Sequence, residues 1–191
     1  MNSSRVESTV LPKNPTYLTP IFENIPAVLQ NFPHWVAWVT IPGTPKPRKI
    51  ALNPGLGYAA STKKPKSWGT FKQAVAFCMA KVGKEHQFRL DDEDVVGVVR
   101  GVGFQLAESS PFTAIDLDKC VAHGQIAPWA WKIVQHMRSY TELSPSSTGL
   151  HIFVNAEKTN NRCRKGKIEI YRHNRFLTVT GHIITKENFN V

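Results

Sequence analysis

Asp116 and Asp118 stand two positions apart in a short apolar segment, FTAIDLDKC, at residues 112–120. The segment is typical of a buried β-strand, and side chains two positions apart in a strand project from the same face. Two carboxylates on one half-buried surface repel each other and lose hydration. A divalent cation removes that cost, because Mg²⁺ and Mn²⁺ prefer oxygen ligands. The spacing therefore predicts a metal site; the alternative is a strand end that turns into a loop with solvated carboxylates.

A third carboxylate lies in another strand candidate, KIEIY at residues 167–171. There Glu169 stands between Ile168 and Ile170, so polar and apolar residues alternate. Sites for two cations, which catalyse phosphoryl or nucleotidyl transfer, generally include such an acid from a neighbouring strand. Taken alone, Glu169 is also typical of a surface residue that pairs with Lys or Arg across a sheet.

The sequence SPSSTG between these two strands predicts a turn that leads into a strand beginning at Leu150. Hydroxyl and backbone N–H groups in a tight turn can surround phosphate oxygens. His151 stands at the start of the strand, in a position to contact a triphosphate, although a lone histidine is also commonly a structural residue. The candidate phosphate ligands of the turn are Ser144, Ser146, Ser147, Thr148 and Gly149.

The chain is strongly basic, with 24 Lys and Arg against 14 Asp and Glu and a net charge of +10. This balance favours an anionic partner, nucleic acid first, over the alternative of a protein that is merely basic. Much of the charge lies in residues 42–68, a stretch rich in Pro, Gly and Lys that we expect to be a functional or solvated loop. The candidate phosphate contacts there are Lys46, Arg48, Lys49, Lys63, Lys64 and Lys66.

A chain of 191 residues is the size of one ordinary domain with a core of its own. Its three cysteines are far apart, which argues against a disulfide scaffold or structural zinc. The first 20 residues lack the apolar core of a signal peptide, and no run approaches about 18 apolar residues. We therefore expect a cytoplasmic protein that does not associate with membranes.

The pattern of helices and strands favours an α+β fold with a largely antiparallel sheet, because the two kinds of element do not alternate strictly. Residues 1–20 are expected to be a flexible arm. Helices are expected at 21–32, at 68–83 with Ser67 as the N-cap, and at 128–140. Residues 90–95 are expected to be a connector. Strands are expected at 34–41, 95–106 (one strand or a bent pair), 112–120, 150–154, 167–171 and 175–184.

The runs FTAIDLDKC, SYTELSPSSTGLHIF and KIEIYRHNRFLTVTG, in this order, closely resemble the catalytic core of the primase-polymerases of phages, plasmids and other mobile elements, within the archaeo-eukaryotic primase superfamily. The resemblance extends over about residues 34–185. It implies an RRM-like antiparallel sheet with flanking helices and a smaller α/β N-terminal portion. Within one catalytic domain at 21–191, it implies an N-terminal subdomain at about 21–90 and a catalytic-motif subdomain at about 91–191.

The resemblance also implies residue roles and an activity. Asp116, Asp118 and Glu169 would be the metal ligands, for Mg²⁺ or Mn²⁺. His151 would contact the triphosphate of the incoming nucleotide, and Arg175 a phosphate. The implied activity is that of a DNA primase or DNA polymerase, a template-directed nucleotidyltransferase that replicates a mobile genetic element in a bacterial or phage-infected cell. Its partners would be a DNA template, a primer strand and nucleoside triphosphates.

Two features depart from the family. Ser147 stands where similar proteins often have Gly, so the turn is expected to be stiffer. The chain ends at Val191, whereas relatives commonly continue into a helical accessory domain and a helicase, so a trimmed core or a minimal version is expected.

Two other functions fit the same residues: a metal-dependent nuclease, and a non-catalytic nucleic-acid-binding module. Trp35, Trp38 and Trp68 are candidates for base stacking or, alternatively, for core packing.

Overall fold

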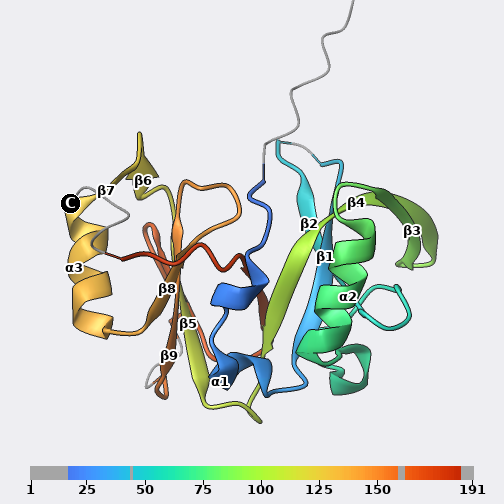
Figure 1. The fold of residues 1–191 in the computed structure, drawn as a ribbon, viewed down its shortest axis with the longest axis horizontal. Coiled ribbons are helices and arrows are strands. Elements are labelled where there is room, and N and C mark those ends of the chain that lie inside the picture. The colour runs from blue at the N-terminus through green and yellow to red at the C-terminus, as the bar shows by residue number, and fades with distance from the viewer. Residues whose placement is uncertain (1–16, 44, 159–161, 186–191) are drawn as a thin grey trace, which may run out of the picture.

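A computed structural model describes residues 17–43, 45–158 and 162–185 of the chain. Two antiparallel sheets stand side by side (Figure 1), which confirms the expected α+β class. Most of the expected arm at residues 1–20 lies outside the described residues. The helices are η1 (Phe22–Asn24), α1 (Ala27–Gln30), η2 (Pro65–Ser67), α2 (Phe71–Lys81) and α3 (Pro128–Met137).

The first sheet has the strand order β12-β4-β1-β2, with β3 paired to β4. Its centre is β1, an apolar strand that is buried along its whole length. The expected strand at 95–106 is one continuous strand, β4, which begins two residues earlier and pairs with β1, β3 and β12. The strands of this sheet are β1 (Trp35–Ile41), β2 (Arg48–Leu52), β3 (Glu85–Leu90), β4 (Glu93–Leu106) and β12 (Arg175–Val179).

The second sheet has the order β10-β11-β5-β9-β8, with every pair antiparallel. It contains the three strands expected from the acidic and histidine motifs. Its strands are β5 (Phe112–Leu117), β8 (Tyr140–Leu143), β9 (Leu150–Asn155), β10 (Arg164–Lys165) and β11 (Ile168–Tyr171). A separate hairpin is formed by β6 (Val121–Ala122) and β7 (Gln125–Ile126).

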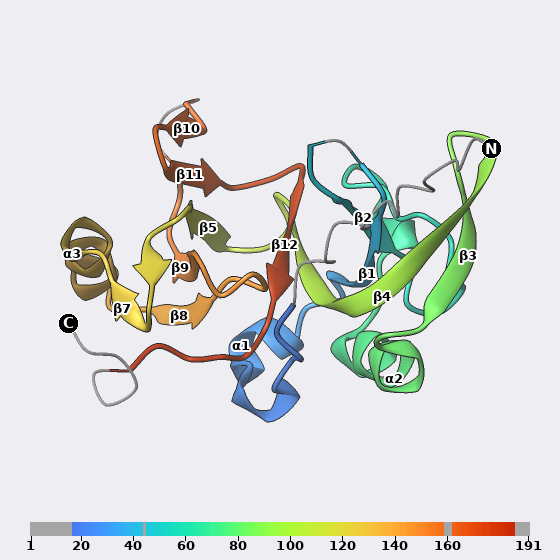
Figure 2. The same cartoon turned by 90° about the horizontal axis from the view of Figure 1, so that it is seen from above.

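Alternation along β5 divides its side chains between two cores. Ile115 and Leu117 pack on the side covered by α3, together with Leu150 and Ile152 of β9. Phe112 and Ala114 project from the opposite face, toward the first sheet. Figure 2 shows α3 on the outer side of the second sheet and β12 at the edge of the first sheet, on the side of the second.

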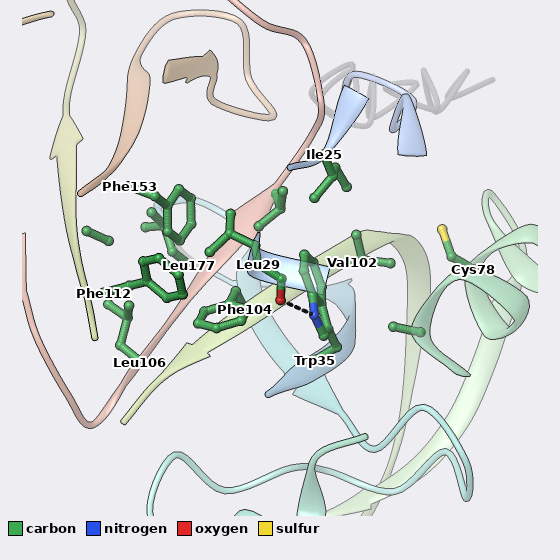
Figure 3. Close-up of a cluster of buried hydrophobic side chains, with 13 residues drawn as sticks. Ile25, Leu29, Trp35, Cys78, Val102, Phe104, Leu106, Phe112, Phe153 and Leu177 are labelled. Carbon is green, nitrogen blue, oxygen red and sulfur yellow. Dashed lines mark hydrogen bonds between the residues drawn. The ribbon is translucent and has the colours of Figure 1, made fainter. Parts of the chain in front are cut away.

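The inward-facing apolar residues form a core that joins the sheets (Figure 3). Phe112 and Phe153 of the second sheet pack with Phe104 and Leu177 of the first. Trp35 closes the core and donates a hydrogen bond from its indole nitrogen to the Leu29 carbonyl over 3.2 Å. Because this core binds the two sheets together, it also fixes the position of the residues at the ends of their strands.

Several sequence expectations are wrong in detail. Helix α2 is capped by Thr70, not Ser67, because Thr70 forms a capping box with Gln73. Helix α3 ends at Met137 because Arg138 takes a left-handed conformation with φ of 47°. The 42–68 stretch contains β2 rather than being wholly irregular, and β3 and β8 were not expected.

The three tryptophans considered for base stacking are core residues. Trp35 and Trp38 are almost fully buried, and Trp68 packs with Val36 and Ala51 on one face of the first sheet. Side chains covered in this way do not offer a face to a nucleic-acid base, so core packing is the correct alternative for all three.

Candidate active site on the second sheet

Four polar residues lie directly opposite one another on adjacent strands of the second sheet. Glu169 of β11 pairs with Asp116 of β5, Asp116 pairs with His151 of β9, and His151 pairs with Glu142 of β8. Residues opposite each other in an antiparallel sheet project from the same face. The four side chains, called here the acidic row, therefore cross the sheet as one line on the face turned toward the first sheet.

Asp116 is the centre of the acidic row. Its side chain is only 20% exposed, and its Oδ1 atom lies 3.8 Å from Nε2 of His151. Desolvation raises the pKa of Asp116, and the charges of Asp118 and Glu169 raise it further, whereas His151 and Lys49 lower it. The fold therefore places a carboxylate where its charged form is disfavoured without a compensating cation.

The unfavourable environment of the Asp116 carboxylate predicts a measurable effect on the stability of the fold. Because the folded pKa of Asp116 is raised, the folded chain holds this proton more tightly than the unfolded chain does. Stability is then lost as pH rises from the ordinary Asp range through the raised folded pKa. Asp116→Asn should therefore raise the melting temperature of the metal-free protein at pH 7, by about 2–4 °C if the gain is ~1 kcal/mol.

The matched control is Asp118→Asn, which makes the same change at a half-exposed side chain and should leave the melting temperature nearly unchanged. Calorimetry of both variants in the presence of a chelator, at pH 7 and again near pH 4, tests this. An Asp116→Asn variant that is less stable than wild type at pH 7 contradicts the prediction.

Asp118 follows the last residue of β5, where its backbone N–H donates to the Lys167 carbonyl over 2.8 Å. Its carboxylate lies 3.9 Å from the Arg164 guanidinium, and its side chain is 48% exposed. Asp116 and Asp118 are thus near each other but unequal, since one is mostly buried in the sheet and the other lies at its edge.

Glu169 is buried and closely surrounded by donors. Tyr171 donates a hydrogen bond to its Oε2 atom over 2.5 Å, and the Arg164 guanidinium lies 3.1 Å from Oε1. Arg175, whose guanidinium stacks over the Tyr171 ring, lies 3.8 Å from Oε2. Burial and the hydrogen bond to Glu169 raise the pKa of Tyr171 to about 12. The alternative prediction, a surface glutamate that pairs with Lys or Arg, is correct in its pairing, since Glu169 contacts two arginines. Glu169 is buried within the acidic row, however, and not at an isolated surface position.

His151 is buried between two carboxylates. Its Nε2 atom faces Asp116 and its Nδ1 atom lies 3.5 Å from Oε1 of Glu142. Glu142 was not identified from the sequence, although it is fully buried. The sequence offers little to identify it, because Glu142 lies in β8, a strand of four residues that shows no clear pattern.

The SPSSTG turn is held by its own side chains. Ser144 is buried and accepts a hydrogen bond from the Gly149 N–H, while Ser146 hydrogen-bonds to both Ser144 and Thr148. A Cβ atom at Gly149 would lie 2.6 Å from the Leu117 carbonyl oxygen, so only glycine fits beside the end of β5. The structure thereby brings the turn against the strand that carries Asp116.

Ser147 takes a left-handed conformation with φ of 57°. Such a conformation is easier for glycine, which gives a physical reason for the Gly that the family resemblance leads us to expect here. The exposed residues of the turn are Ser146, Ser147 and Thr148.

The expected basic residues divide into two groups. Lys49 on β2 belongs to the site's surroundings: its Nζ atom lies 5.4 Å from the centre of the Trp38 ring, and Asp116 and Asp118 act on its charge. Desolvation lowers the pKa of Lys49 although the residue is exposed at the surface, and the two carboxylates oppose that shift. Lys46 and Arg48, which precede Lys49 in the sequence, are also exposed. The second group, Lys63, Lys64 and Lys66, is exposed on and before η2, a separate segment.

A further basic segment was not identified from the sequence. Residues 158–167 contain five Lys or Arg residues and no acidic residue. Residues 162–167 of this segment are exposed and form β10 and the turn into β11, and Arg164 contacts both Asp118 and Glu169. The acidic row therefore has basic residues on two sides, one group from each sheet.

The donor atoms of the acidic residues fit a hard divalent cation in kind, but they are not gathered into a cage. Among the residues that the structure describes, no three His, Cys, Asp or Glu side chains are grouped as metal ligands. Arg164 instead lies against two of the three expected ligands. A cation shared by Asp118 and Glu169 would have to displace this guanidinium.

No family model matches the chain. Among curated proteins, it is 32% identical over 173 residues to a protein of Nitratiruptor phage NrS-1 named DNA primase-polymerase. The match covers 83% of this chain and 21% of that protein, so the chain spans about a fifth of its relative's length. The antiparallel α+β fold is consistent with a primase-polymerase fold. The chain belongs to the primase-polymerase family, as its motifs suggested.

Within the described residues, no helix combines the length and the apolar character needed to cross a lipid bilayer.

Proposed function

We propose that this chain is a template-directed nucleotidyltransferase, a DNA primase or DNA polymerase that acts in the replication of a mobile genetic element. The observation that carries the proposal is the acidic row, in which Glu169, Asp116 and His151 lie opposite one another on three adjacent strands. A second support is the similarity to a phage protein named DNA primase-polymerase. Together they favour nucleotide transfer over other reactions of phosphate esters.

Asp116, Asp118 and Glu169 would hold Mg²⁺ or Mn²⁺. A cation bound there would lower the pKa of the primer's 3′-hydroxyl and stabilise the leaving pyrophosphate. Asp116 is suited to this role because desolvation disfavours its charge until a cation compensates it. Tyr171, through its hydrogen bond to Glu169, would keep that carboxylate in one orientation.

The incoming nucleotide would lie beside His151 and the SPSSTG turn. His151 faces Asp116 through Nε2, so its ring would lie beside the proposed cation and the phosphates of the nucleotide. The exposed hydroxyls of Ser146, Ser147 and Thr148 would contact phosphate oxygens, with buried Ser144 and Gly149 fixing the loop. Arg175, close to Glu169, would balance the charge of the triphosphate once the cation engages that carboxylate.

The two exposed basic segments, residues 63–66 and 162–167, would bind the backbone of the template or primer. Replacing three cations in one segment should flatten the salt dependence of single-stranded DNA binding by about two in log–log slope, since each phosphate contact contributes ~0.7. Fluorescence anisotropy at several salt concentrations measures this. The test variants are Lys63→Gln/Lys64→Gln/Lys66→Gln and Arg162→Gln/Lys165→Gln/Lys167→Gln; the matched control, on the outer helices and the β3 side, is Lys72→Gln/Lys84→Gln/Lys132→Gln.

If a segment contacts DNA, its triple variant should show a flatter salt dependence than the control variant. All three variants have lost the same net charge, so a difference in slope reports contact with phosphates. Equal slopes for a test variant and the control would show that the segment acts only through net charge.

The experiment that separates this function from its rivals is incubation with a labelled primer on a template, nucleotides, and Mg²⁺ or Mn²⁺. Lengthening of the primer supports the polymerase. Shortening would support a metal-dependent nuclease, and a gel shift without either would support a non-catalytic binding module. Unprimed single-stranded DNA with ribo- or deoxyribonucleotides supplied separately then tests priming.

The finer features of the proposal follow from the family. The order β11-β5-β9-β8, with α3 between β5 and β8, supports an RRM-like sheet. The division into subdomains near residue 90, a cytoplasmic location, and a helicase or helical accessory partner remain parts of this proposal.

A further inference from the structure

Glu142 is a fully buried residue whose carboxyl group accepts several hydrogen bonds on one side. Its Oε2 atom accepts hydrogen bonds from the Thr180 N–H over 2.9 Å, the Gly181 N–H over 2.7 Å and the Tyr140 hydroxyl over 2.6 Å. Its Oε1 atom is 3.1 Å from the same Thr180 nitrogen. Three donors directed at one oxygen require an acceptor there, so they hold the carboxyl group of Glu142 in a single orientation.

The free side of the carboxylate faces His151. Nδ1 of His151 lies 3.5 Å from Oε1 of Glu142. Nδ1 is buried and has no hydrogen-bond partner among the described residues at standard geometry. A small rotation of the ring would complete a bond between these two atoms, and a buried polar nitrogen left without one is costly.

The chemistry of Glu142 bears on whether Nδ1 of His151 carries a proton. An ionised carboxylate accepts hydrogen bonds and donates none. A lone pair on Nδ1 would face that charge and be repelled, whereas an Nδ1–H group would donate to it. Carboxylates commonly fix the tautomer and orientation of functional histidines in this way.

We propose that Glu142 is a positioning residue: it accepts a hydrogen bond from Nδ1–H of His151 and so holds Nε2 toward Asp116 and the nucleotide. This inference rests on the proposed function, because it deepens the role of His151 in that site. It does not place Glu142 in contact with the substrate.

The anchors of Glu142 connect His151 to a distant part of the chain. Thr180 and Gly181 follow β12, and the Thr180 carbonyl accepts a hydrogen bond from the Ile21 N–H over 2.8 Å. A Cβ atom at Gly181 would lie 2.0 Å from the Ile21 carbonyl oxygen, so the two segments are in close contact. Figures 1 and 2 show the N-terminal segment that leads into α1 (blue) running along one side of the molecule, near the junction of the two sheets. The orientation of His151 is therefore set from outside its own strand.

The direct test is ¹⁵N spectroscopy of the imidazole rings at one fixed pH, with His151 assigned by its absence in His151→Ala. Wild type should show a protonated Nδ1. In Glu142→Gln the amide NH₂ faces the ring once the amide oxygen accepts from Thr180 and Gly181, so Nδ1 should lose its proton. An unprotonated Nδ1 in wild type, or an unchanged one in Glu142→Gln, overturns the proposal.

The functional test is a double-mutant cycle on equilibrium binding of a non-hydrolysable nucleoside triphosphate analogue. Glu142→Gln should weaken binding about 10-fold in the wild-type background and less than about 2-fold in the His151→Ala background. Equal factors in both backgrounds would mean that Glu142 does not act through His151.

Tyr140→Phe is the matched control for packing. It removes one donor to Oε2 but leaves the two backbone donors and the oxygen that faces His151, so it should lower stability without changing the tautomer of His151. A tautomer change in Tyr140→Phe equal to that in Glu142→Gln would refute a specific role for the carboxylate. If the wild-type chain neither binds nucleotide nor lengthens a primer, the proposed function fails, while the ring spectra still decide whether Glu142 fixes His151.

Discussion

Replacing Asp116 and Asp118 together by asparagine is expected to lower the rate of primer extension by about 1,000-fold or more. The reason is that both carboxylates lie at the end of β5 beside Glu169, where they would supply most of the negative charge for a divalent cation. Asparagine has nearly the same shape, so the fold should be retained. Single-turnover extension of a labelled primer measures the effect.

The chain offers a matched control in Asp91→Asn/Asp92→Asn. These two residues form an exposed acidic pair in the turn between β3 and β4, away from the acidic row. The control makes the same change in net charge and should keep extension within about 2-fold of wild type. Extension that survives the Asp116/Asp118 replacement would remove these residues from the reaction.

His151→Ala is expected to raise the KM for the incoming nucleotide by about 30-fold, with a smaller fall in kcat. The size follows from the loss of a hydrogen bond to a charged phosphate, which is worth roughly 1.5–3 kcal/mol. Steady-state kinetics on a primed template separates the two constants.

His123→Ala is the comparison, since His123 is exposed in the β6–β7 turn and should leave both constants unchanged. An unaltered KM together with a normal kcat in His151→Ala would show that His151 does not contact the nucleotide.

The acidic motifs could be predicted because alternation along a strand is visible in the sequence. Asp116, His151 and Glu169 were each placed correctly on a strand. Their alignment across the sheet could not be predicted, because strand order and register depend on long-range pairing. The same limit explains why Glu142 was missed: the four residues of β8 are too few to show a period, and the importance of Glu142 appears only when β8 lies beside β9.

Local composition is a poor guide to the structure in two other places. The strand β2 lies within a Pro-, Gly- and Lys-rich stretch, and it forms because its Ile50 and Leu52 pack against β1 and the α2 side of the first sheet. The basic hairpin at 162–167 was hidden because positive charge alone does not show that Arg164 reaches Asp118 and Glu169. In both cases tertiary packing, rather than local propensity, determined the outcome.

The central claim is that Asp116, Asp118 and Glu169 hold divalent cations at which a nucleotide is transferred. Anomalous diffraction from a crystal grown with Mn²⁺ and a non-hydrolysable nucleoside triphosphate tests it most directly. The predicted result is Mn²⁺ bound to these three carboxylates, with Arg164 moved off Glu169 and the triphosphate between the cation and His151. Mn²⁺ bound elsewhere, with Arg164 still paired to Glu169 and Asp118, would contradict the account.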